Sequence, residues 1–147
     1  MLKLIIADDE RVIRETISNL IDWRSLDAEL IGLFSNGLEA YDMIIDESPD
    51  IVLTDIKMPG MSGLELIRKI SETDLDTQFV ILSGYGEFEY AKEAMKYGVK
   101  QYVLKPCSQS KIEEAIREVS RDCYALKQAR NLENSQYLLT NNMQHNI

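Results

Sequence analysis

Apolar residues fall into short runs that alternate along the chain with segments of helical periodicity. The runs are rich in aliphatic and β-branched residues and are bounded by polar turn residues, which is typical of strands buried on both faces of a parallel sheet. Five such strands are predicted, at residues 2–7, 30–34, 51–54, 79–82 and 102–104. The pattern therefore predicts an α/β fold in which each strand is followed by a helix.

The segments between the strands repeat apolar residues every three or four positions, as the buried face of a helix requires. Four predicted helices carry Ile13, Ile17, Leu20 and Ile21; Leu38, Tyr41, Ile44 and Ile45; Leu64, Ile67 and Ile70; and Phe88, Ala91 and Met95. Clusters of Gly, Pro, Ser and Asn lie at the junctions. These clusters mark turns, so the elements have short connections.

A fifth helix is predicted at the end of the chain, because no Gly or Pro follows Pro106. Residues that share one face of it are Ile116, Val119, Cys123 and Leu126. We expect this helix to begin near Ser108 and to continue beyond Leu126. Residues 131–147 are rich in Asn and Gln, and we expect fraying there.

Composition limits the domain count and the partners. At 147 residues we expect one domain over residues 1–122, followed over residues 123–147 by an extension of the last helix that begins a linker. The chain carries 25 acidic and 16 basic side chains, a formal net charge of −9, and the negative excess lies within residues 1–107. Binding of nucleic acid through a basic face is therefore excluded for this chain itself.

The cysteines and the histidine exclude two further classes of site. Cys107 and Cys123 lie sixteen positions apart and His145 is the only histidine, so neither a disulfide framework nor a zinc cluster can form. Free cysteines are typical of the cytoplasm, which is the location we expect. The apolar residues 2–7 are too few for a signal peptide, and no run approaches about eighteen apolar residues, so we expect no membrane span.

Polar side chains cluster where the predicted strands end. Asp8 and Asp9 follow the first strand, Asp55 the third, Ser83 the fourth and Lys105 the fifth. With right-handed crossovers and the strand order 2-1-3-4-5, these strand ends meet at the edge where open α/β sheets bind ligands. We expect the five side chains to form one shallow pocket.

Three carboxylates in one pocket repel one another, and a hard divalent cation relieves that repulsion. Mg²⁺ fits because it binds a few carboxylates and keeps bound water. With this cation the pocket becomes neutral and accepts an anionic phosphoryl group, whose oxygens Lys105 and Ser83 would contact. No His, Cys or Gly-rich phosphate loop lies at this edge, so we identify Asp55 as the nucleophile.

Four segments that occur in order resemble the receiver domain of two-component response regulators. They are Asp8-Asp9, residues 54–60 with the sequence TDIKMPG, Ser83-Gly84, and residues 102–106 with the sequence YVLKP. The resemblance extends over about residues 2–122 and implies a doubly wound, flavodoxin-like sheet. The sequence LSGYGEFEYA at residues 82–91, with Ile21-Asp22-Trp23, looks like the branch whose full-length members carry a C-terminal AraC-type DNA-binding domain. That domain is missing here, and DNA would be bound only through it.

The resemblance implies a role for each pocket residue. Asp55 would accept a phosphoryl group from a sensor histidine kinase. Mg²⁺ would be bound by Asp9, Asp55 and the backbone carbonyl of Lys57, with Asp8 acting through a water molecule. Lys105 would pair with the added charge, and the Lys105-Pro106 peptide bond would be cis.

The resemblance also implies a switch. Phosphorylation would draw Ser83 inward and let Tyr102 turn toward the interior, while Lys57 and Tyr85 would tune the lifetime of the aspartyl phosphate. The surface that changes would be formed by the fourth helix, the fifth strand and the fifth helix. A homodimer through that surface, or through the extended last helix as a short coiled coil, is an alternative that the sequence leaves open.

Plainer interpretations exist for each residue. The acids at residues 8–10 could cap the first helix, Asp55 and Lys105 could be exposed, Ser83 could belong to a turn, and Tyr102 could be a half-buried strand residue. The shared edge favours a site over these interpretations.

Two other functions compete with a phosphorylated switch. A phosphatase of the haloacid-dehalogenase type also uses an Asp nucleophile, but it needs a second Asp two positions on, where this chain has Lys57. A receiver fold that only binds partners is disfavoured because the acid pair, the acceptor and the lysine are all present. We therefore expect phosphoryl transfer to Asp55 and slow hydrolysis, and no enzyme activity on an external metabolite.

Overall fold

The structure is a computed structural model that describes residues 1–145, with side chains described through residue 140. Its five strands form one parallel sheet in the predicted order β2-β1-β3-β4-β5. The strands are β1 (Leu2–Ala7), β2 (Ala28–Phe34), β3 (Ile51–Asp55), β4 (Gln78–Ser83) and β5 (Gln101–Leu104). Each predicted strand is present, and its ends differ from the prediction by at most two residues.

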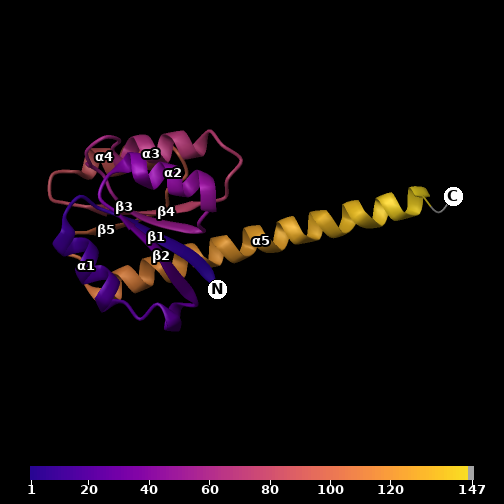
Figure 1. Ribbon diagram of the computed structural model, residues 1–147, viewed down its shortest axis with the longest axis horizontal. Helices are drawn as coiled ribbons and strands as arrows, with labels where there is room; N and C mark the ends of the chain where they lie inside the picture. Colours follow the sequence, from indigo (N-terminus) through magenta and orange to yellow (C-terminus); the bar gives the residue numbers. More distant parts are fainter. Residues whose placement is uncertain (146–147) are drawn as a thin grey trace.

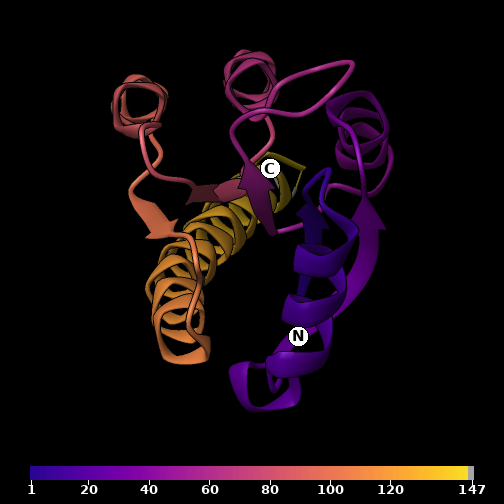
Figure 2. The ribbon, with the colours of Figure 1, turned by 90° about the vertical axis from the view of Figure 1, so that its left-hand side faces the viewer.

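Helices cover both faces of the sheet. They are α1 (Arg11–Leu20), α2 (Gly37–Glu47), α3 (Gly63–Ser71), α4 (Phe88–Met95) and α5 (Gln109–His145), and a short 3-10 helix, η1 (Arg24–Leu26), leads into β2. Figure 2 shows α1 and α5 on one face and α2, α3 and α4 on the other. None of these described helices has the length and apolar character that a membrane crossing requires.

The two layers of helices follow from the alternation of side chains along each strand. In β1, Leu4 packs in the core that α1 and α5 cover, and its neighbour Ile5 packs in the core that the other three helices cover. Both side chains are fully buried. The central strands are therefore apolar at almost every position, which is the pattern that distinguishes them in the sequence.

The register of the sheet brings four strand ends to one level. Ala7 pairs with Thr54, Thr54 pairs with Ile81, and Ser83 pairs with Leu104. The residues at or just after these positions therefore lie side by side at the carboxyl-terminal edge of the sheet.

Helix α5 is 37 residues long and differs from the prediction at its far end. The sequence predicts fraying from Asn131, whereas the structure continues the helix to His145; residues 146–147 lie outside the described part. This segment contains no Gly or Pro, the residues that most strongly disfavour a helix, so the helical backbone continues through it. Every described side chain after Arg130 is exposed, and Figure 1 shows this part projecting away from the sheet.

Polar contacts attach α5 to the opposite, amino-terminal edge of the sheet. Lys127 Nζ lies 3.1 Å from Asp50 Oδ1, and the Arg130 guanidinium pairs with the Asp76 carboxylate. The Cys123 thiol donates to the Asp50 carbonyl over 3.5 Å. Because Asp50 and Asp76 precede β3 and β4, these contacts fix the direction in which α5 leaves the domain.

Candidate functional site

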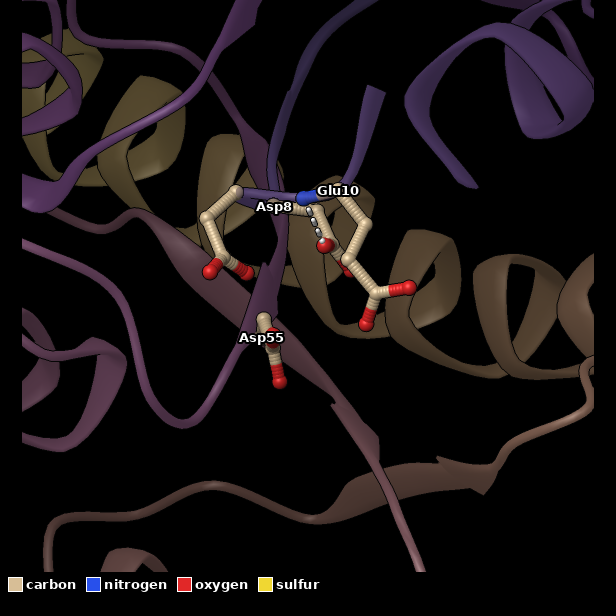
Figure 3. A group of neighbouring side chains, drawn as sticks. Asp8, Glu10 and Asp55 are labelled. Atoms are coloured by element: carbon tan, nitrogen blue, oxygen red, sulfur yellow. Dashed lines mark hydrogen bonds between the residues drawn. The ribbon is translucent and has the colours of Figure 1, made fainter. Parts of the chain in front are cut away.

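The predicted pocket residues meet at the carboxyl-terminal edge of the sheet. Asp8 follows β1, Asp55 ends β3, Ser83 ends β4 and Lys105 follows β5. Asp8, Asp55 and Ser83 are buried, with exposed fractions of 0%, 5% and 1%. Figure 3 shows Asp8, Glu10 and Asp55 grouped at this edge. The register of the sheet therefore assembles the predicted pocket.

Lys105 links the carboxylates of this pocket. Its Nζ lies 3.0 Å from Asp8 Oδ2, 3.3 Å from Asp55 Oδ2 and 3.8 Å from Glu10 Oε1. The peptide bond from Lys105 to Pro106 is cis, as the sequence resemblance implies. One positive charge thus offsets part of the repulsion between acids that neighbouring strands hold together.

Backbone donors orient the two buried carboxylates. The Glu10 N–H donates to Asp8 Oδ1 over 2.9 Å, and the Ile56 N–H donates to Asp55 Oδ1 over 2.8 Å. Asp8 Oδ2 accepts no hydrogen bond from any described residue, and its 3.0 Å contact with Lys105 is an ion pair without hydrogen-bond geometry. Among the described residues, the Lys105 ammonium is therefore the partner of this buried oxygen, and a cation bound there would compete with it.

The surroundings of Asp55 favour its protonated form. Burial raises the pKa of Asp55 to about 6, and the charge of Asp8 acts in the same direction, against Lys105 and the Ile56 N–H. Burial by itself would lower the pKa of Lys105, but the contacts with Asp8 and Asp55 together raise it. At neutral pH Asp55 is therefore mostly ionised and Lys105 is charged.

The acids of the pocket fit a hard divalent cation. Asp8, Asp9, Glu10 and Asp55 can each bring one carboxylate oxygen within 4.8 Å of the others. Asp9 and Glu10 are exposed, so the cluster opens to solvent on one side. Carboxylate oxygens are the donors that Mg²⁺ prefers, and Asp8 contributes one of them to this set.

Glu10 is the member of this cluster that sequence reasoning missed. The sequence suggests only that it caps a helix together with Asp8 and Asp9. In the structure Glu10 is the N-cap residue of α1, but its side chain makes no capping hydrogen bond within the described chain and faces Lys105 instead. The run of three consecutive acids was the signal available in the sequence.

The loop after β3 returns to the backbone of Asp55 through Gly63. The Gly63 N–H donates to the Ile56 carbonyl over 2.7 Å, and a Cβ at this position would lie 1.8 Å from the Asp55 carbonyl oxygen. Ser62 caps α3 by accepting the Glu65 N–H over 3.1 Å. The start of α3 therefore supports the backbone of Asp55, and only glycine fits at this close approach.

The predicted switch and tuning residues lie around the pocket. Ser83 is buried, whereas Tyr102 on β5 is 39% exposed. Lys57 places its Nζ 4.9 Å from the centre of the Tyr90 ring in α4, and Tyr85 is fully exposed. The pocket therefore adjoins α4 on one side and β5 on the other.

Known sequences match this chain over most of its length. Residues 4–117 match the response regulator receiver domain. The chain is 56% identical over 125 residues to the transcriptional regulatory protein YesN of Bacillus subtilis. The aligned region covers 82% of this chain and 34% of YesN. The chain is 36% identical over 121 residues to the transcriptional regulatory protein HptR of Staphylococcus aureus, covering 82% of this chain and 47% of HptR. The chain spans less than half the length of these relatives.

Solved structures show the same fold. The REC domain of AraT, a response regulator from Geobacillus stearothermophilus, matches with a TM-score of 0.78 and 33% identity, over 88% of this chain and 98% of that chain. A two component transcriptional regulator AraC from Clostridium phytofermentans matches with a TM-score of 0.79 and 31% identity, over 85% and 97% of the two chains.

Proposed function

Because this chain belongs to the response regulator receiver domain family, we propose that Asp55 is its phosphoacceptor and that a sensor histidine kinase supplies the phosphoryl group. The position of Asp55 carries this proposal. It is buried at the carboxyl-terminal edge of the sheet, and its Oδ2 lies 3.3 Å from Lys105 Nζ. The relatives named as transcriptional regulatory proteins support a signalling role.

In the proposed reaction a carboxylate oxygen of Asp55 forms a bond to phosphorus. The bond from phosphorus to the donor breaks, and the donor keeps the electron pair. Asp55 is mostly ionised at neutral pH because its pKa is about 6. The Lys105 ammonium neutralises charge on the phosphoryl oxygens, and the Ser83 hydroxyl donates to one of them.

The residues that would bind Mg²⁺ are Asp8, Asp9, Asp55 and the carbonyl of Lys57, with Asp8 acting through a water molecule. Glu10 adds a fifth oxygen donor at the exposed rim of this set. When bound, Mg²⁺ would offset the negative charge of the acids and orient the incoming phosphoryl group. The buried Asp8 Oδ2, which accepts no hydrogen bond and pairs only with the Lys105 ammonium among the described residues, supports this assignment.

Phosphorylation would act through Ser83 and Tyr102. Ser83 would move toward the new charge, and Tyr102, which is half-exposed in this structure, would turn toward the interior. The surface formed by α4, β5 and α5 would then differ between the two states. That surface, or the projecting part of α5, would form a homodimer.

The chain would work as a switch in the cytoplasm and not as an enzyme on an external substrate. Lys57 lies where a haloacid-dehalogenase phosphatase needs its second Asp, so only transfer to Asp55 and slow hydrolysis of the product are proposed. In the full-length protein, regulation of transcription would come from a C-terminal AraC-type domain that binds DNA.

The test is incubation with acetyl phosphate and Mg²⁺, followed by intact mass measurement. One added phosphoryl group increases the mass by about 80 Da. We expect this species in the wild type, and we expect Asp55→Asn and an excess of EDTA to abolish it. Asp46→Asn, which removes an exposed acid from α2, is the matched control and should retain it. Modification of Asp55→Asn at the wild-type level would contradict the proposed acceptor.

A further inference from the structure

The backbone N–H of Gly84 is held by an acidic side chain of the chain itself. It donates to Glu87 Oε1 over 2.6 Å, and the Glu87 N–H donates back to the Gly84 carbonyl over 3.2 Å. Gly86 has a φ of +87°, which turns the backbone so that Glu87 reaches Gly84. Glu87 is half-buried and is the N-cap residue of α4.

Gly84 lies between the strand that carries the acceptor and the strand that precedes the lysine. It follows Ser83 at the end of β4, where Leu82 pairs with Asp55 and Ser83 pairs with Leu104. Gly84 and Lys105 also line a cavity of about 480 Å³ next to α1, and Asp55 is not among the residues that line it. The Gly84 N–H therefore belongs to the edge at which the proposed phosphoryl group arrives.

A backbone N–H at the carboxyl edge of a parallel sheet is a natural donor to an anion. The Gly84 N–H already binds one, because its partner is a carboxylate at a short distance. A single N–H cannot serve a phosphoryl oxygen and the Glu87 carboxylate with full strength at the same time. The two anions therefore compete for this donor, and they also repel each other.

We propose that Glu87 is an internal competitor of the phosphoryl group on Asp55. In the unphosphorylated state its carboxylate occupies the Gly84 N–H, and it leaves when a phosphoryl oxygen takes that donor. This inference rests on the proposed function of Asp55. It adds a positioning residue that links the site to α4, because Glu87 begins that helix.

The alternative role for Glu87 is to hold the loop between β4 and α4 in shape. In that case, loss of the carboxylate loosens the loop and weakens anion binding. Competition predicts the opposite sign, since loss of the carboxylate frees the donor and removes a negative charge.

The test uses beryllofluoride with Mg²⁺ as a phosphoryl analogue and isothermal titration calorimetry as the measurement. We expect Glu87→Ala to bind the analogue about tenfold more tightly than the wild type, the size expected for one charge-assisted hydrogen bond. Glu87→Gln should shift affinity in the same direction, because its amide oxygen is a weaker acceptor. Glu89→Gln is the matched control: it removes an exposed acid from the first turn of α4, and its affinity should stay within about twofold.

Two results would overturn the proposal. One is that both Glu87 variants, shown by thermal unfolding to be folded, bind the analogue as the wild type does or more weakly. The other is that the Gly84 amide resonance of the wild type does not shift on binding. If instead the wild type binds no analogue at all, it is the proposed function of Asp55 that fails.

Discussion

At the scale of single residues, the proposed acceptor Asp55 is an acid that would have to react as an anion in surroundings that favour its neutral form. Burial and the charge of Asp8 raise the pKa of Asp55 to about 6, and Lys105 limits the rise. The two carboxylates would attract a divalent cation, whereas the Lys105 ammonium would oppose its binding. Protons, the Lys105 ammonium and a divalent cation would therefore compete for the carboxylates of Asp8 and Asp55.

We expect the free energy of unfolding to depend on pH through Asp55. The folded pKa is about 6 and the ordinary value is 3.8, so the folded state binds the proton more tightly. The stability that this provides is complete at low pH and is lost as the pH rises from about 4 through about 6, by up to roughly 3 kcal/mol. Urea unfolding of the wild type and of Asp55→Asn, over a range of pH and without Mg²⁺, measures this change in the free energy of unfolding.

The asparagine does not titrate, so Asp55→Asn should gain stability over the wild type by this amount between about pH 4 and pH 7. Asp46→Asn should follow the wild type, since Asp46 is exposed. A difference between Asp55→Asn and the wild type that stays constant with pH would contradict the raised pKa.

A second expectation concerns competition between Lys105 and the cation. The ammonium lies 3.0 Å from Asp8 Oδ2, the oxygen that no hydrogen bond occupies. Lys105→Ala should therefore increase the affinity for Mg²⁺ alone by about tenfold in a calorimetric titration. Lys100→Ala is the control, because Lys100 is exposed and pairs with Asp122. An unchanged or weaker affinity of Lys105→Ala would mean that the lysine does not compete.

The sequence predicted the pocket residues that follow strands, and it missed those that a loop brings in. Asp8, Asp55 and Lys105 were identified because strand ends share an edge in any parallel sheet. The contact of Glu87 with Gly84 depends on the path of a loop with a positive φ. The periodicity of apolar residues predicts helices and strands but not the path of a loop, so this contact is seen only in the structure.

At the scale of elements, α5 joins the two edges of the sheet. It begins at Gln109, four positions after Lys105, and crosses the face of the sheet to Asp50 and Asp76 at the opposite edge. The Arg130 guanidinium holds the pKa of the Asp76 carboxyl below its usual range, so this attachment persists into mildly acidic solution.

We expect Arg130→Ala to loosen the middle of α5. Arg130 binds Asp76 on another element, whereas Arg121 pairs with Glu118 within α5. Hydrogen exchange of the amides at residues 124–130 should be faster in Arg130→Ala, while Arg121→Ala should match the wild type. Equal exchange in all three proteins would show that the ion pair does not attach the helix.

The far end of α5 shows how composition and backbone preference can disagree. A segment rich in Asn and Gln suggested fraying, because such residues bury little apolar surface. The structure keeps residues 131–145 helical, and the side chains described through residue 140 are exposed. An exposed helix makes its backbone hydrogen bonds within itself, so it needs no partner for them. Burial patterns predicted the part of α5 that packs on the sheet but not the part that has no core to face.

At the scale of the whole molecule, the site and the proposed switching surface meet at β5, and β4 connects the site to α4. Binding of Mg²⁺ and beryllofluoride should therefore shift amide resonances across residues 87–120, with Tyr102 among them. Residues in α2, which lies beside β2 at the end of the sheet away from β5, should shift little. If residues 87–120 do not respond although the analogue binds, the proposed switch fails while the acceptor stands.

The overall fold was predictable because the central strands are buried on both faces and the helices that cover them on one. The order of the strands was predicted as that of a doubly wound, flavodoxin-like sheet with right-handed crossovers. The orientation of α5 beyond the sheet was not predictable, because it depends on ion pairs between residues far apart in the sequence, such as Asp76 and Arg130.

After Arg130, its last contact with the sheet edge, α5 runs straight (Figure 1), so its far end has a fixed distance and a fixed rotational orientation relative to the sheet. From Asn131 to His145 it extends by roughly 20 Å at 1.5 Å per residue. A tilt of about 5° at its base would move the far end by roughly 2 Å over that length. Each residue also turns the helix by about 100°, so removing one residue before the far end of α5 would rotate that end to another side of the helix axis. Removing seven residues would nearly restore its orientation and bring it about 10 Å closer to the sheet.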